Sequence, residues 1–173
     1  RAIEKSTNGI LQATHFFPHT GAHPLCYSVA YYLKDGDQLR SLTDILTVAE
    51  LREMLAHGYL LQPAAESAEL FRRAIDQLWT AGDTKNLLPA ARRLVERVYP
   101  PGRQLSSAER QAAAEDALLA VYLHAHMDED TFDLARVVVC PDQVPDPEGR
   151  LIPACTYNLF YREKDPRFWC AAS

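Results

Sequence analysis

Residues 26–46, CYSVAYYLKDGDQLRSLTDIL, give the clearest indication of the fold. Within this stretch, the apolar runs 26–33 and 39–46 flank KDGDQ, whose Asp35-Gly36 pair is a turn signal. β-Branched and aromatic residues on both sides of such a turn are typical of paired strands. We therefore predict a β-hairpin that begins at Cys26.

The residues between this hairpin and position 126 have the spacing of amphipathic helices. Thr47 with Glu50, and Ser106 with Glu109, have the spacing of the capping boxes that begin helices. Gly82 is a helix stop signal further along. We predict four helices, the last of them covering 108–126, with their apolar stripes in the core.

The last third of the chain is rich in proline and predicts a second pair of strands. LARVVVC (134–140) and RLIPACTYNLFYRE (150–163) are apolar runs, and the turn-rich PDQVPDPEG (141–149) joins them. The predicted class is α+β. It consists of a small mixed or antiparallel sheet, made by the hairpin near 26–46 and C-terminal strands near 136–162, and covered by about four helices.

Composition excludes several classes of protein. The net charge is -5 and no dense run of Lys and Arg occurs, so nucleic acid is not an expected partner. No stretch approaches the ~18 apolar residues needed to cross a bilayer, and no signal peptide is visible. Four cysteines are too few for a secreted disulfide scaffold, so we expect a cytoplasmic protein without a transmembrane segment.

The four cysteines are the first candidate metal ligands. A hairpin through 141–149 would bring Cys140 and Cys155 together, and Cys170 and Cys26 could complete the set. Thiolates are soft, strongly donating ligands that suit zinc and iron-sulfur clusters. None of these spacings is CxxC, so buried free thiols remain the alternative.

The sequence HAHMDED (124–130) is a second candidate. His124 and His126 resemble the His-x-His of metal-dependent hydrolases, and the acidic residues after them could supply oxygen ligands. Residues two apart on a helix point in roughly opposite directions, which disfavours shared ligation in the predicted helix. The alternative is a helix end whose histidines interact with the helix dipole.

Two stretches carry a resemblance to a known family. FFPHTGAHPLCYSVAYYL (16–33) and MDEDTFDLARVVVCPDQVPDPEGRLIPACTYN (127–158) resemble the C-terminal half of radical S-adenosylmethionine enzymes. The similar group includes tetraether lipid synthase and uncharacterised bacterial relatives. The shared phrases are of the type Pro-Cys-x-His-Pro-x-Cys and Phe-Asp-Leu-x-Arg, followed by Gly-Arg-x-Ile-Pro-x-Cys-x-Tyr-Asn. Gly21 stands where the first of these phrases has its first cysteine.

The resemblance implies an auxiliary iron-sulfur cluster, of the 4Fe-4S type, held by Cys26, Cys140 and Cys155. Cys170 is the candidate to replace the thiolate missing at Gly21. The resemblance also implies that 1–25 is the tail of a barrel domain and 26–173 an auxiliary domain for the cluster and a substrate. Four aromatic residues could wall a pocket for an apolar substrate, or else belong to the core: Tyr157, Phe160, Tyr161 and Trp169.

The motif CxxxCxxC, which binds the cluster that cleaves S-adenosylmethionine, is absent from the 173 residues. The chain also opens with Arg1, so we expect a piece of a longer enzyme. Its partner would be the rest of the barrel, and S-adenosylmethionine would bind only to the intact enzyme. Two alternatives stay open, namely a structural zinc-binding or interaction module, and a metal-dependent hydrolase that uses His124 and His126.

Overall fold

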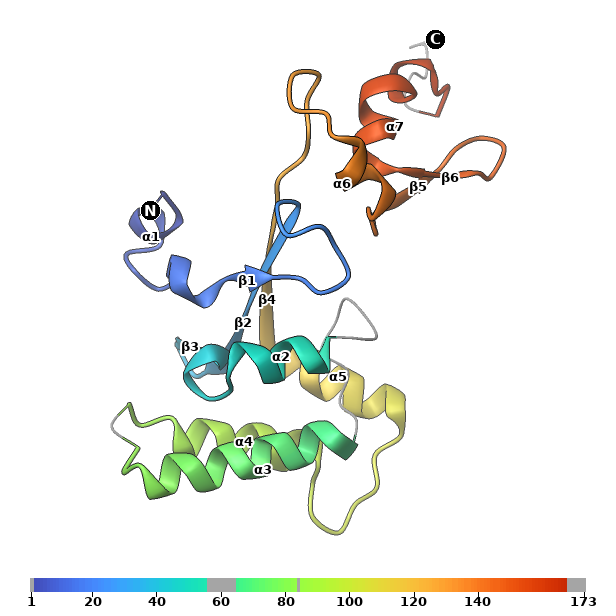
Figure 1. The fold of residues 1–173 in the computed structure, drawn as a ribbon. Helices are drawn as coiled ribbons and strands as arrows, with labels where there is room; N and C mark the ends of the chain where they lie inside the picture. Colours follow the sequence, from blue (N-terminus) through green and yellow to red (C-terminus); the bar gives the residue numbers. More distant parts are fainter. Residues whose placement is uncertain (1, 56–64, 84, 168–173) are drawn as a thin grey trace.

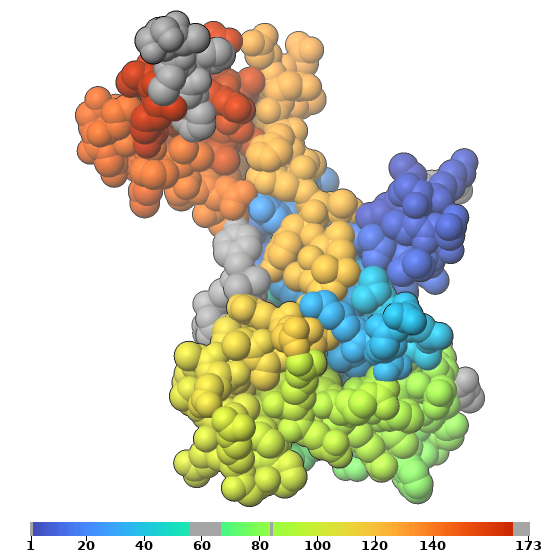
Figure 2. All heavy atoms as spheres, turned by 180° about the vertical axis from the view of Figure 1, so that it is seen from behind, coloured from blue at the N-terminus to red at the C-terminus, as the bar shows by residue number. Residues whose placement is uncertain are grey.

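The computed structural model describes residues 2–55, 65–83 and 85–167. A four-stranded antiparallel sheet lies between a helical body and a separate C-terminal lobe, residues 127–167 (Figure 1). Seen from behind, the same two bodies are joined by a narrower waist (Figure 2). The predicted α+β class is confirmed.

Strand β2 organises the sheet. The strands are β1 (Phe17–Pro18), β2 (Tyr27–Asp35), β3 (Gln38–Ser41) and β4 (Leu118–His124). β4 pairs with β2 from Tyr27 to Leu33, so β1 and β3 share the other edge of β2. The predicted hairpin is confirmed as β2 and β3, and Gly36 adopts the positive φ of 60° that its turn needs.

Helices cover the sheet and bury its apolar side chains. They are α2 (Val48–Met54), α3 (Ala65–Thr80), α4 (Leu88–Val98) and α5 (Ser107–Ala117), preceded by the short α1 (Ala2–Ser6). Short 3₁₀ turns lie at Ala13–His15 and Leu42–Asp44. One core unites residues of β2 with residues of the helices, including Val29, Leu33, Leu51, Phe71, Ala91 and Leu94.

The predicted start and stop signals of the helices are present in the structure. Both capping boxes are present, with Thr47 and Ser106 accepting from the backbone N–H groups of Glu50 and Glu109. Gly82 follows α3 with a positive φ of 82°. The sequence also predicts that the apolar face of the helix after Thr47 ends near Gly58, which lies outside the described residues.

The prediction of a helix over 108–126 is wrong in its second half. The helix α5 ends at Ala117, and Leu118–His124 is strand β4. The run contains valine and tyrosine and suits either structure, but β2 is buried and its second edge needs hydrogen-bonding partners. Pairing with β4 supplies those partners over seven residues.

The predicted second pair of strands is present near the C-terminus, but it is shorter than the runs 134–140 and 150–163, which are mainly helical. This part of the chain forms α6 (Leu134–Val138), β5 (Gln143–Pro145), β6 (Leu151–Pro153), α7 (Ala154–Phe160) and the 3₁₀ turn Arg162–Lys164. The Asp133 side chain accepts from the Ala135 N–H at 2.8 Å and begins α6. Strands β5 and β6 form a hairpin of their own and do not join the central sheet.

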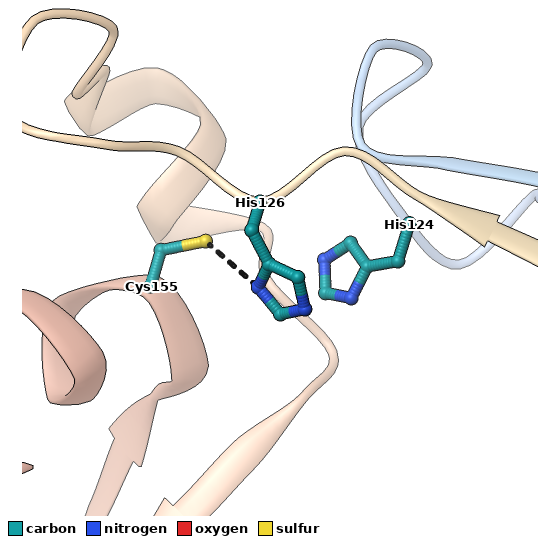
Figure 3. Close-up of side chains that lie close together, drawn as sticks. All are labelled: His124, His126 and Cys155. Carbon is teal, nitrogen blue, oxygen red and sulfur yellow. Dashed lines mark hydrogen bonds between the residues drawn. The ribbon is translucent and has the colours of Figure 1, made fainter.

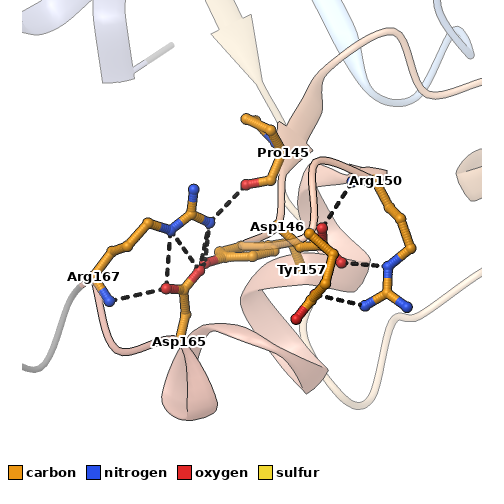
Figure 4. A network of polar contacts seen from close by, with 7 residues as sticks. Pro145, Asp146, Arg150, Tyr157, Asp165 and Arg167 are labelled. Atoms are coloured by element: carbon orange, nitrogen blue, oxygen red, sulfur yellow. Dashed lines mark hydrogen bonds and ion pairs between the residues drawn. The ribbon is translucent and has the colours of Figure 1, made fainter.

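The C-terminal lobe has its own buried polar network (Figure 4). Asp165 is 3% exposed, and the Arg167 Nε lies 2.9 and 3.0 Å from its two carboxylate oxygens. The Tyr157 hydroxyl donates to the same carboxylate, and Arg167 also donates to the Pro145 carbonyl at 2.6 Å. These contacts tie α7 and the residues after it to the β5–β6 hairpin.

The Asp165 network predicts a pH-dependent contribution to stability. The hydrogen bonds from Arg167 hold the pKa of the Asp165 carboxyl far below its usual range. The ionised carboxylate therefore stabilises the fold above the unfolded pKa of about 3.9, and this contribution is lost as the pH falls further. We expect Asp165→Asn to lower the urea midpoint at pH 6, with the gap to wild type narrowing at pH 3. If the difference in urea midpoint between wild type and Asp165→Asn were equal at both pH values, the charge of Asp165 would not be its source.

Candidate metal centre

The end of strand β4 places two histidines on one face. His124 is the last residue of β4, and His126 follows after one residue. Residues two apart in extended backbone point to the same side, and the two imidazole centroids lie 3.9 Å apart (Figure 3). The expectation that these side chains diverge is wrong, because it assumed a helix at this position.

Cys155 reaches the histidine pair from the C-terminal lobe. It lies in the first turn of α7 and is 3% exposed. Its Sγ lies 3.8 Å from the His126 Nδ1 and accepts from the Met127 backbone N–H at 3.4 Å. One ligand atom from each of His124, His126 and Cys155 lies within 4.8 Å of the others.

This spacing fits one tetrahedral metal ion. Zinc binds sulfur at about 2.3 Å and imidazole nitrogen at about 2.0–2.1 Å, which places the two donors about 3.6 Å apart. The 3.8 Å between the Cys155 Sγ and the His126 Nδ1 is close to that separation. The three side chains can therefore hold a metal ion with little movement.

An aromatic ring and a carboxylate surround His124. The Tyr27 ring stacks on the His124 ring at 4.3 Å, and the His124 Nδ1 lies 3.2 Å from the Asp142 Oδ2. Burial, together with the neighbouring His126, lowers the pKa of His124, although Asp142 opposes this shift. The imidazole is therefore neutral near pH 7, which is the form that binds metals.

The structure places the other predicted cysteine ligands next to this centre but outside the group. The Cys26 Sγ accepts from the Arg136 Nε at 3.1 Å, and Arg136 also donates to the Ala125 carbonyl at 2.6 Å. The Cys140 Sγ donates to the Asp142 carbonyl at 3.3 Å. Burial raises the pKa of Cys140, and the neighbouring Cys155 adds to this shift.

No three cysteines come within 4.8 Å of one another in the described part of the chain. Cys170 lies outside the described residues. The acidic residues after His126 do not join the group either, because the Asp128 side chain accepts from the backbone N–H of Thr131 instead, at 2.9 Å.

Within the described part of the chain, the predicted aromatic pocket residues do not form an apolar cavity, because Tyr157 and Tyr161 border an open pocket that they share with charged residues of the lobe, among them Arg150 and Lys164. Tyr157 is 2% exposed and bonds to Asp165, whereas Phe160 and Tyr161 are exposed at 52% and 43%. Trp169 lies outside the described residues. These positions give no enclosed apolar wall among the residues that the structure describes.

The fold and the site define an α+β protein with a candidate His-His-Cys metal centre between its sheet and its C-terminal lobe. No family model matches the chain, and no curated protein matches it. Among the described helices, none has both the length and the apolar character to cross a membrane.

Proposed function

We propose that this chain is the metal-binding auxiliary region of a radical S-adenosylmethionine enzyme, with His124, His126 and Cys155 as its metal ligands. The observation that carries the proposal is the convergence of three ligand atoms within 4.8 Å from two separate parts of the chain. The proposed partner is the barrel that cleaves S-adenosylmethionine, since CxxxCxxC is absent from this sequence.

The two stretches that resemble the radical enzymes both border the centre. The first supplies Cys26 and Tyr27, and the second supplies Asp142 and Cys155. Direct hydrogen bonds join them, from the Arg136 Nε to the Cys26 Sγ at 3.1 Å and from the Tyr27 hydroxyl to Asp142 at 3.1 Å. The resemblance and the geometry therefore support the same location for the functional site.

The donor set favours a single zinc-type ion. Two imidazoles and one thiolate suit zinc, and three protein ligands leave a tetrahedral ion one position for water or a substrate donor atom. The ion would also fasten the C-terminal lobe to the end of the sheet, because His124 belongs to β4 and Cys155 to α7.

The second candidate is an auxiliary 4Fe-4S cluster anchored on Cys155. It is favoured by the positions of Cys26 and Cys140, whose thiols lie on either side of the junction between the sheet and the lobe. The described residues fit this cluster less well than a single ion. Both thiols would have to leave their present hydrogen-bonding partners, Arg136 and the Asp142 carbonyl.

Metal analysis after anaerobic purification tests the ligand set of the proposal. We expect a colourless chain with one bound zinc, which is lost in Cys155→Ala and in the His124→Ala, His126→Ala double variant. Cys26→Ala should keep the metal.

A brown chain with iron and sulfide, lost in Cys26→Ala and Cys140→Ala, would favour the cluster. Metal retained in Cys155→Ala but lost without the histidines would favour a hydrolase-type site. A wild-type chain that binds neither metal would contradict the proposal.

A further inference from the structure

One carboxylate oxygen of Asp142 meets two groups from the central sheet. The Asp142 Oδ2 lies 3.2 Å from the His124 Nδ1 and accepts from the Tyr27 hydroxyl at 3.1 Å. Tyr27 and His124 are directly paired across β2 and β4, whereas Asp142 lies in the C-terminal lobe between α6 and β5. The carboxylate therefore bridges the two bodies of the molecule.

The bond to Asp142 selects one tautomer of His124. A neutral imidazole carries one proton, and a carboxylate partner at Nδ1 keeps that proton on Nδ1. The lone pair is then on Nε2, and the His124 ring is directed toward His126 and Cys155 (Figure 3). Metal-binding histidines commonly donate their other N–H to a carboxylate in this way.

Tyr27 holds both members of the pair. Its ring lies over the His124 imidazole at 4.3 Å with an angle of 29° between the planes. Its hydroxyl donates to the same Asp142 oxygen that faces His124. Burial and the hydrogen bond to Asp142 raise the pKa of Tyr27 to about 12, so the phenol keeps its proton near pH 7.

We propose that Asp142 is a positioning residue that, together with Tyr27, offers the His124 Nε2 to a metal ion. This inference rests on the proposed function. Because Asp142 belongs to the C-terminal lobe, His124 is oriented as a ligand only when that lobe is docked on the sheet. The same docking brings Cys155 to the histidines, so the complete ligand set and the docked lobe form together.

The variant Asp142→Leu tests this role, because leucine has nearly the shape of aspartate but accepts no hydrogen bond. Without the carboxylate nothing holds the proton on Nδ1, so we expect His124 to shift toward the tautomer protonated on Nε2. Zinc affinity, measured by competition with a chromophoric chelator, should fall about 10- to 100-fold. Tyr27→Phe keeps the stacked ring and should lower the affinity less, by under about tenfold.

Long-range ¹⁵N NMR of the metal-free chain shows which imidazole nitrogen of His124 carries the proton. If Asp142 had only a structural role, its replacement would not change this tautomer. The matched control is Asp133→Asn, which alters a carboxylate of the same lobe that caps α6. It should leave both the tautomer and the affinity at wild-type values. An unchanged tautomer in Asp142→Leu would overturn the inference. If wild type bound no zinc, the proposed function would fail, and the tautomer measurement would still decide the role of Asp142.

Discussion

Removing the metal from the wild-type chain is expected to release the C-terminal lobe while the rest of the fold stays intact. The main core contains buried residues up to Ala117 and none from the lobe. Polar contacts hold the lobe to the sheet, among them those of Arg136 with Cys26 and of Asp142 with Tyr27. A metal link between His126 and Cys155 adds a cross-link that closes a loop of 29 residues.

The size of this effect follows from loop closure. A cross-link over a loop of this length lowers the entropy of the open state by an equivalent of about 3–4 kcal/mol. Chelation should therefore raise amide hydrogen exchange in α6 and α7 by roughly two to three orders of magnitude. Exchange in β2 and α4 should change little, because their residues belong to the main core.

Exchange measured by mass spectrometry on peptides of each region checks this prediction. Cys155→Ala without added chelator should reproduce the exchange of the chelated wild type, because the sulfur link is gone. Exchange in α6 and α7 that stays the same with and without metal would show that the ion does not fasten the lobe. A uniform rise across β2 and α4 as well would show that the metal stabilises the whole fold.

The second large effect is expected from a single truncation in the main core. Leu51 of α2 is fully buried at 0% exposure and belongs to the cluster that unites helices and sheet. Leu51→Ala removes buried methyl groups and leaves a cavity, which costs about 2–5 kcal/mol. Since domains of this kind have a free energy of unfolding of about 5–15 kcal/mol, the variant should lose a large part of its stability.

Urea unfolding followed by circular dichroism measures this loss as a lower transition midpoint. The matched control is Val48→Ala on the same helix, because Val48 is 39% exposed. Its free energy of unfolding should stay within about 0.5 kcal/mol of wild type. Equal losses in the two variants would contradict the placement of the core on the Leu51 face of α2.

Local signals in the sequence predict the β2–β3 turn and much of the helical body. The Asp35-Gly36 turn, the capping boxes and Gly82 each act through residues close in sequence, and all of them appear in the structure. The helix prediction for the run 118–124 fails because its identity as a strand depends on β2, which lies about ninety residues earlier. An apolar run of this length has no local feature that separates helix from strand.

The candidate site depends on the same distant pairing. The His124 and His126 pair was noted in the sequence, but only extended backbone turns both side chains to one face. Cys155 was predicted as a ligand on the basis of its thiol, without its histidine partners. Asp142 and Tyr27 were missed, because a carboxylate in a turn and a tyrosine at a strand start give no signal until the fold brings them together.

X-ray absorption at the zinc edge of the zinc-loaded chain identifies the ligands of the proposed centre, because it reports the atoms bound to the ion. The proposed centre predicts one sulfur at about 2.3 Å, two imidazole nitrogens at about 2.0–2.1 Å and one further light atom. In Cys155→Ala the sulfur shell should disappear. A zinc shell made only of oxygen and nitrogen in the wild type, or one that keeps its sulfur in Cys155→Ala, would contradict the assignment of His124, His126 and Cys155 as the ligands.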